Sequence, residues 1–168
     1  MEAGKYTYGI QNIMCHWASK EAGLTIGKFC SIAANVNIYL GGGHRTDWIT
    51  TYPFGHINAA TFDNPAPFGH PKSNGSVVIG NDVWVASNVT IMSGITIGDG
   101  CVIANNSHVV KDCEPYGIYG GNPAKLIKKR FSPEQIEKLL ELKWWNLSDE
   151  KINELIPVLC SGDIEKLF

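Results

Sequence analysis

An aliphatic residue returns at every sixth position in the middle of the chain. From residue 79 to residue 109 that position is always Ile or Val, and the position four places further on is small or of medium size. Helices repeat near 3.6 residues and strands at 2, so neither explains the period alone. Because six is even, a strand that turns a corner once per hexad keeps the same residues inward. The pattern predicts a solenoid of short parallel strands with two sets of inward residues: Ile79, Val85, Ile91, Ile97, Ile103, Val109; and Val83, Val89, Ile95, Cys101, Ser107, Cys113.

The same period occurs upstream, where Ile26, Ile32 and Ile38 lie six apart. The 41 residues from Ile38 to Ile79 are not a multiple of six, so the chain is expected to leave the coil over roughly residues 40–75. Long loops inside compact domains are usually functional or disordered. This one is rich in aromatic residues, which favours an ordered binding loop over a solvated one.

The period changes to that of helices near the C-terminus. Ser132 lies three residues before a Gln and directly before a Pro, which is typical of a helix N-terminus and predicts a helix over about 133–144. A second helix is expected to begin after Ser148 and to be broken by Pro157 and a later Gly. We expect these helices to cover the open end of the solenoid, where a strand edge would otherwise be exposed.

Length and composition fit one mainly β domain. Residues 1–130 would form the coil with its loop, and residues 131–168 its helical extension. A net charge of -2 and a pI near 6.2 give no reason to expect nucleic acid or an anionic membrane as partner. No apolar run approaches the roughly 18 residues that span a bilayer, and the N-terminus lacks a secretory signal, so a cytoplasmic location is expected. Five cysteines without a C-x-x-C pair favour neither disulfides nor zinc.

Four stretches carry a resemblance to a known family: "GGGHRTDWITTYPF", "IGNDVWVAS", "GGNPAKLIKKRF" and "LKWWNLSDEKI". With the hexads, they resemble the hexapeptide-repeat acyltransferases of the xenobiotic type, which include type B chloramphenicol and streptogramin acetyltransferases as well as polysaccharide and sugar acetyltransferases. The resemblance implies a left-handed parallel β-helix and a homotrimer. It also implies that acetyl-CoA, as acyl donor, lies in a cleft between two subunits.

His44 is the candidate general base for acetyl transfer. A base must take the proton of the attacking acceptor, and the ordinary pKa of His suits this near neutral pH. His44 follows three glycines and matches the catalytic His of the family. Asp47 either orients this imidazole or is a turn residue, and the sequence leaves both open. Trp48, Tyr52 and Phe54 are expected to line the acceptor pocket, and without a G-x-S-x-G elbow direct transfer is favoured over an acyl-enzyme.

The groove for coenzyme A needs small residues, free backbone groups and cations. Ala86 and Ala104 each follow an inward aliphatic residue, so pantetheine can approach the chain there, and Trp84 is placed to flank it. The resemblance adds polar and basic residues along the same channel and towards the nucleotide: Ser87, Asn105, Lys111 and Lys125.

The expected acceptor is a sugar, a sugar nucleotide or a polysaccharide unit, acetylated on O or N. Gly43 precedes His44 where antibiotic-modifying members of the family carry Asn, which argues against the alternative, a chloramphenicol or streptogramin acetyltransferase. A metalloenzyme of the carbonic-anhydrase type would need three converging histidines. The remaining histidines, at positions 16, 56, 70 and 108, lack such spacing, so no metal is expected. An inactive trimeric scaffold is disfavoured by the intact His44 loop.

Overall fold

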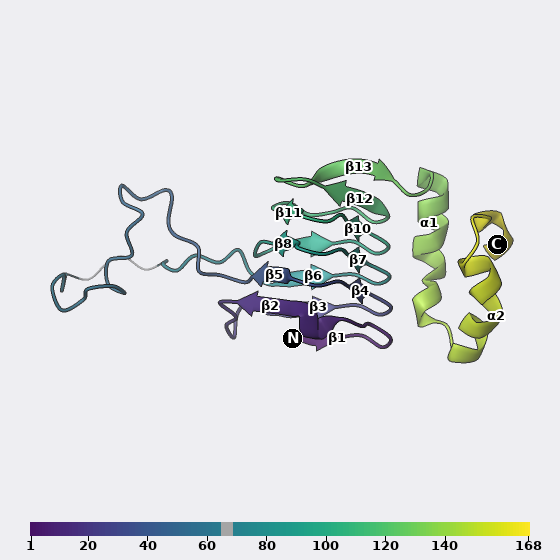
Figure 1. Cartoon of the computed structure of the whole chain (residues 1–168), viewed down its shortest axis with the longest axis horizontal. Helices are drawn as coiled ribbons and strands as arrows, with labels where there is room; N and C mark the ends of the chain where they lie inside the picture. Colours follow the sequence, from purple (N-terminus) through teal and green to yellow (C-terminus); the bar gives the residue numbers. More distant parts are fainter. Residues whose placement is uncertain (65–68) are drawn as a thin grey trace.

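Short strands wind into a coil with three flat sides in the computed structural model, which describes residues 1–64 and 69–168 (Figure 1). The first sheet has the order β1 (Glu2–Ala3), β3 (Leu24–Ile26), β6 (Val77–Ile79), β9 (Thr96–Ile97). The second has the order β13 (Lys125–Lys129), β12 (Gly117–Gly120), β10 (Val102–Ile103), β7 (Trp84–Val85), β4 (Ser31–Ile32). The third has the order β11 (His108–Val109), β8 (Thr90–Ile91), β5 (Val36–Tyr39), β2 (Ile13–His16).

The hexad register sets the stacking of the coil. Ile32, Val85 and Ile103 are register partners in successive rungs, paired in parallel. Both sets of predicted inward residues are buried, and every Ile and Val at the sixth position from Ile79 to Val109 is at most 1% exposed. Each such side chain contributes about 1.5–3 kcal/mol when fully buried. The predicted parallel β-helix fold is confirmed.

Three columns of corners join the three sheets. The first corner column lies between the first and second sheets and turns through left-handed residues, namely Tyr6, Phe29, Asp82, Gly100 and Tyr116. The second corner column lies between the second and third sheets and contains the small residues Ala33, Ala86, Ala104 and Gly120. The third corner column leads from the third sheet back to the first. The predicted loop leaves the coil there, between β5 and β6, and projects away from it (Figure 1).

The C-terminal helices lie along the side of the coil, beside the first corner column (Figure 1). The expectation that they cover its open end is therefore wrong. β13 turns back antiparallel onto β12 and already takes the hydrogen bonds of that last strand. The aromatic residues of the first corner column attract the helical segment instead, with the rings of Phe29 and Trp144 4.8 Å apart.

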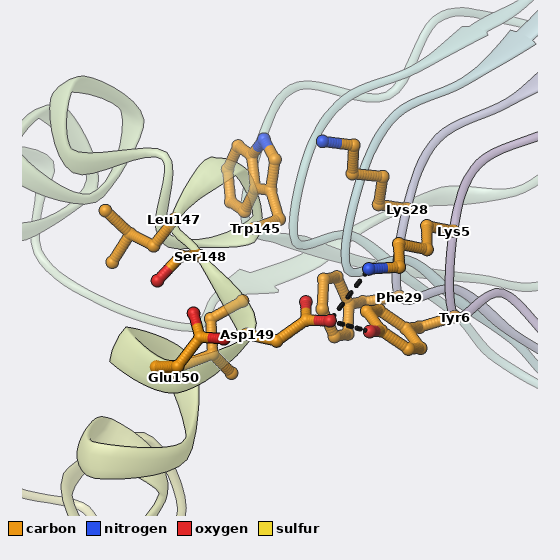
Figure 2. A pocket seen from close by; sticks show the side chains of 10 residues that line it. Lys5, Tyr6, Lys28, Phe29, Trp145, Leu147, Ser148, Asp149 and Glu150 are labelled. Carbon is orange, nitrogen blue, oxygen red and sulfur yellow. Dashed lines mark hydrogen bonds and ion pairs between the residues drawn. The ribbon is translucent and has the colours of Figure 1, made fainter.

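A polar contact also joins the helical segment to the first rung. Lys5 Nζ lies 2.8 Å from the carboxylate of Asp149, and the Tyr6 hydroxyl donates to the same oxygen (Figure 2). Asp149 is the first residue of α2 (Asp149–Leu159), where a negative charge favours the helix dipole. Lys5 and Tyr6 lower the pKa of this carboxyl, so the contact is retained near neutral pH.

The helix boundaries differ slightly from the predicted ones. The capping box at Ser132 is present and begins α1 (Pro133–Leu142), which ends two residues early because Lys143 adopts a left-handed conformation. Pro157 does not break α2, which continues to Leu159, because a proline near the helix end removes a single hydrogen bond. The described residues also contain short 3-10 turns, at Ile10–Asn12, Trp144–Asn146 and Ile164–Leu167. Within the described residues, no helix has the length and apolar character that crossing a membrane requires.

Candidate functional site

The foot of the loop holds His44 in a fixed place. Gly43 and Lys72 form an antiparallel bridge, with N–O distances of 3.0 and 2.6 Å, that ties the outgoing leg of the loop to the returning one. Gly42 has φ 76° and lies against the indole of Trp17, where an added Cβ would approach the ring to 2.4 Å. Only glycine fits this position without strain, so the backbone directly before His44 is well defined.

The hydrogen bond of His44 defines its tautomer. Nδ1 lies 2.7 Å from the carbonyl oxygen of Thr51, within the same loop. A carbonyl oxygen only accepts, so Nδ1 carries the proton and donates it to Thr51. In the neutral imidazole Nε2 then has a free lone pair, and the side chain is exposed. The geometry is that of a base able to take a proton from a bound molecule.

Asp47 is paired with Arg45 within the chain, away from His44. Arg45 Nε donates to Asp47 Oδ1 at 2.7 Å, and a second guanidinium nitrogen contacts Oδ2. This hydrogen bonding lowers the pKa of the Asp47 carboxyl to about 2. The guanidinium also lies 5.3 Å from the ring of Trp48. The sequence left two roles open for Asp47, as a residue that orients the imidazole of His44 or as a turn residue. In the structure the Thr51 carbonyl, and not Asp47, accepts the hydrogen bond of that imidazole.

Two of the three predicted acceptor-pocket residues, Tyr52 and Phe54, form a cluster with a further ring, whereas Trp48 lies against Arg45. The rings of Tyr52 and Phe54 are 4.7 Å apart, and Phe62 packs edge-on against Phe54 at 5.2 Å. Asn58 donates to the Tyr52 hydroxyl at 2.7 Å, which fixes that ring. These three rings remain 37–47% exposed, so the cluster offers an open apolar surface.

Two histidines that are distant from His44 in the sequence form a row with it, in which His70 contacts His44 and His56 contacts His70. The rings of His44 and His70 are 4.9 Å apart and nearly perpendicular, and His70 Nδ1 lies 3.1 Å from His56 Nδ1. Folding of the loop brings them together, so sequence spacing carried no signal of it. In the described part of the chain, no three or more His, Cys, Asp or Glu side chains are arranged to hold a metal ion.

The proposed groove residues gather along the second corner column, with one exception. Ala86 and Ala104 stack in neighbouring rungs, and an added Cβ at Gly120 would lie 3.3 Å from that of Ala104. Lys125 pairs with Gly120 at the end of this column. Ser87 and Asn105 directly follow these alanines, and Trp84, which is 52% exposed, lies in β7 two residues before Ala86.

Lys111 is the exception, because it lies in the third corner column. It follows β11, so the third sheet separates it from Asn105. The loop that carries His44 also leaves from the third corner column. Within one chain, the candidate base His44 and the small-residue column are therefore on different sides of the coil.

Comparisons with known proteins identify the repeat and close relatives. Residues 76–111 match the bacterial transferase hexapeptide (six repeats). A probable macrolide acetyltransferase of Lysinibacillus sphaericus is 51% identical over 94% of this chain and 88% of its own. A chloramphenicol acetyltransferase of Klebsiella aerogenes is 49% identical over 84% of this chain and 68% of its own. A Vibrio cholerae hexapeptide-repeat acetyltransferase, solved with acetyl coenzyme A, shares the fold with a TM-score of 0.52 at 21% identity over 78% of this chain and 72% of its own.

These relatives overturn the expected saccharide acceptor. Both of the similar sequences are acetyltransferases named for antibiotics, and they align over most of this chain. Glycine at position 43 does not exclude an antibiotic acceptor, for a structural reason. Its N–H and C=O both pair with Lys72, and an added Cβ would lie 3.0 Å from the Lys72 carbonyl oxygen. Glycine at this position therefore reflects the bridge at the foot of the loop and carries no information on the acceptor.

The fold, the hexad register and the His44 loop agree with this similarity in sequence. At 51% identity over 94% of its length, the chain belongs to the hexapeptide-repeat acetyltransferases of the xenobiotic type, and it is an acetyl-CoA-dependent acetyltransferase.

Proposed function

We propose that this enzyme transfers the acetyl group of acetyl-CoA to a hydroxyl group of an antibiotic, with His44 as general base. The observation that carries the proposal is the hydrogen bond from His44 Nδ1 to the Thr51 carbonyl, which leaves Nε2 free. Chloramphenicol and macrolides both offer aliphatic hydroxyls, which are too weakly acidic to attack a thioester without a base. The names of the relatives place antibiotics first among acceptors to be tested.

Each step of the proposed transfer has a place for its proton. His44 Nε2 takes the proton of the acceptor hydroxyl as its oxygen attacks the thioester carbonyl. The carbon–sulfur bond then breaks, and the imidazolium returns the proton to the leaving thiolate, which regenerates neutral His44. The Thr51 carbonyl keeps the ring in its tautomer and favours the transient positive charge.

Direct transfer agrees with the state of the buried thiols. Burial raises the pKa of Cys101 to about 11 and that of Cys113 to about 12, so neither is a thiolate near neutral pH. The thiolate is the reactive form of cysteine. Both side chains also lie in the core of the coil, where an acyl donor has no access.

The proposed groove runs along the second corner column. The small side chains of Ala86, which is buried, and of Ala104, which is half-buried, are proposed to leave room for pantetheine beside this column. Lys125, at the end of the column, is proposed to attract the phosphates of the nucleotide. Lys111 is separated from this column by the third sheet. If Lys111 contacts coenzyme A bound along the column, that lysine would therefore belong to another copy of the chain.

A trimer would bring base and groove together. His44 and the second corner column are on different sides of one coil. The loop projects away from its own coil (Figure 1), and we propose that it reaches a neighbouring one. The aromatic cluster of Tyr52, Phe54 and Phe62 is open in the single chain and exposes apolar surface that a partner would cover. We propose a homotrimer with each site between two subunits. Part of that cluster would face the antibiotic. Phe68, a further aromatic residue of the loop, lies outside the described residues.

The test is turnover of acetyl-CoA against a panel of acceptors. Thiol release is measured with chloramphenicol, a macrolide and a streptogramin, and with sugars and sugar nucleotides as comparison. We expect turnover with at least one antibiotic. His44→Ala should lower kcat by about a hundredfold or more while the affinity for acetyl-CoA stays unchanged. His16→Ala is the matched control, because His16 stacks on Tyr39 at 4.4 Å on the coil, outside the loop. Wild-type kcat in His44→Ala would refute the assignment.

A further inference from the structure

The bridge at the foot of the loop places a second imidazole against the proposed base. Gly43 and Lys72 are paired, so the residues that follow Gly43 face those that precede Lys72. His44 and His70 meet in this way, with ring centroids 4.9 Å apart and an interplanar angle of 86°. The edge-on contact is the usual favourable geometry of two aromatic rings. The bridge therefore brings the two legs of the loop close together beside these two rings.

His70 is in turn held by a third imidazole. His70 Nδ1 and His56 Nδ1 are 3.1 Å apart, so one donates to the other, and their ring centroids are 4.9 Å apart. Nε2 of His70 is buried and has no hydrogen-bond partner among residues 1–64 and 69–168. Desolvation, together with the neighbouring His44 and His56, lowers the pKa of His70. His70 is therefore neutral at neutral pH and does not repel the imidazolium that forms on His44 during transfer.

The nearest charged groups are engaged elsewhere. An added Cβ at Gly69 would lie 2.5 Å from an Arg45 guanidinium nitrogen, so Arg45 passes close to the backbone before His70. Its guanidinium is paired with Asp47. Within the part of the chain that the structure describes, neither side chain forms a hydrogen bond with His44, whose imidazole contacts the ring of His70 and the carbonyl of Thr51.

We propose that His70, held by His56, is a positioning residue that fixes the imidazole of His44 for proton abstraction. The inference rests on the proposed role of His44 as base. A single hydrogen bond to Thr51 leaves the ring free to turn about the Nδ1–O direction, and Nε2 moves with it. A second contact, from His70, removes that freedom. Orientation of a reacting group contributes strongly to rate, and a small displacement lowers it.

A double-mutant cycle tests the proposal. His70→Ala should lower kcat about tenfold or more, with the KM for acetyl-CoA unchanged, because the base is present but poorly oriented. His70→Phe keeps a ring against His44 and should recover most of kcat. The double variant with His44→Ala should be no slower than His44→Ala alone, because His70 acts only through His44. His16→Ala controls for the loss of a histidine outside the cluster.

The outcomes separate this inference from the proposed function. Wild-type kcat in His70→Ala, with His44→Ala impaired, would overturn the positioning role and leave the base in place. Losses that add in the double variant would also overturn it, since His70 would then act independently. Wild-type kcat in His44→Ala would remove the base, and the inference with it. If His70→Ala does not fold, His56→Ala carries the test: the proposal requires a lower kcat and a changed His44 imidazole nitrogen signal in NMR, and it fails if both match the wild type.

Discussion

The five cysteines illustrate how burial sets chemistry at the scale of single residues. Cys30, Cys101 and Cys113 fill small inward places of the coil and are buried, while Cys15 and Cys160 are exposed. Burial raises the pKa of each of the three buried thiols. They contribute to the core as small apolar groups.

Thiol labelling should therefore report on the core. In the native enzyme at pH 8, we expect Cys30, Cys101 and Cys113 to resist iodoacetamide, because the thiolate is scarce and sterically shielded. In denaturant all five cysteines should react. Peptide mass spectrometry after labelling identifies the modified residues. Rapid native labelling of Cys101, with Cys160 as the reactive control, would contradict the packing described here.

The site residues show what sequence reasoning can and cannot reach at this scale. His44 was identifiable from its glycines and its motif, and the aromatic residues after it from their density. The pairing of Asp47 with Arg45 could not be identified from the sequence, because the conformation of the turn decides which neighbouring side chain a carboxylate contacts. His56 and His70 are separated from His44 by loop segments without periodicity, so only the folded loop shows their proximity.

At the scale of elements, the hexad determines the coil because each inward position is repeated in every rung. Its corners were less predictable, since Tyr6, Phe29 and Tyr116 adopt positive φ where glycine would be expected. The placement of the helices depends on those aromatic corners and on β13, which no period indicates. Arg130 joins these parts: it donates to the Gly100 carbonyl at 2.7 Å and lies 3.7 Å from the Asp82 carboxylate.

Loss of this arginine should destabilise the enzyme in a pH-dependent way. Burial raises the pKa of Asp82, and Arg130 partly opposes that rise. Arg130→Ala should raise the pKa of Asp82 further, so the penalty applies where the carboxyl is charged and fades as falling pH protonates it. We expect a loss of about 1–3 kcal/mol in the free energy of unfolding at pH 8 and a smaller loss at pH 5.

Urea unfolding at fixed protein concentration measures both values. Lys128→Ala is the control, because Lys128 is an exposed basic residue two positions before Arg130, in β13. An equal loss for Arg130→Ala at the two pH values would show that Asp82 is not the partner whose charge matters. No loss at pH 8 would show that Arg130 does not join the strand to the corner.

At the scale of the whole molecule, the loop leaves from the third corner column and the helices lie beside the first (Figure 1). This arrangement separates the base from the groove within each chain. The proposed trimer resolves the separation, since the loop of one subunit would meet the second corner column of the next.

Complementation between two inactive variants tests this account most directly. His44→Ala lacks the base, and Ala104→Leu should obstruct the groove, with Ala104→Ser as the control of wild-type size. Each variant alone should be nearly inactive at limiting acetyl-CoA. Mixed by co-refolding in equal amounts, they should recover roughly a quarter of wild-type activity, because about that share of interfaces pairs an intact His44 with an open groove from another subunit. No recovery, in mixtures shown by native mass spectrometry to contain mixed trimers, would contradict a site shared between subunits.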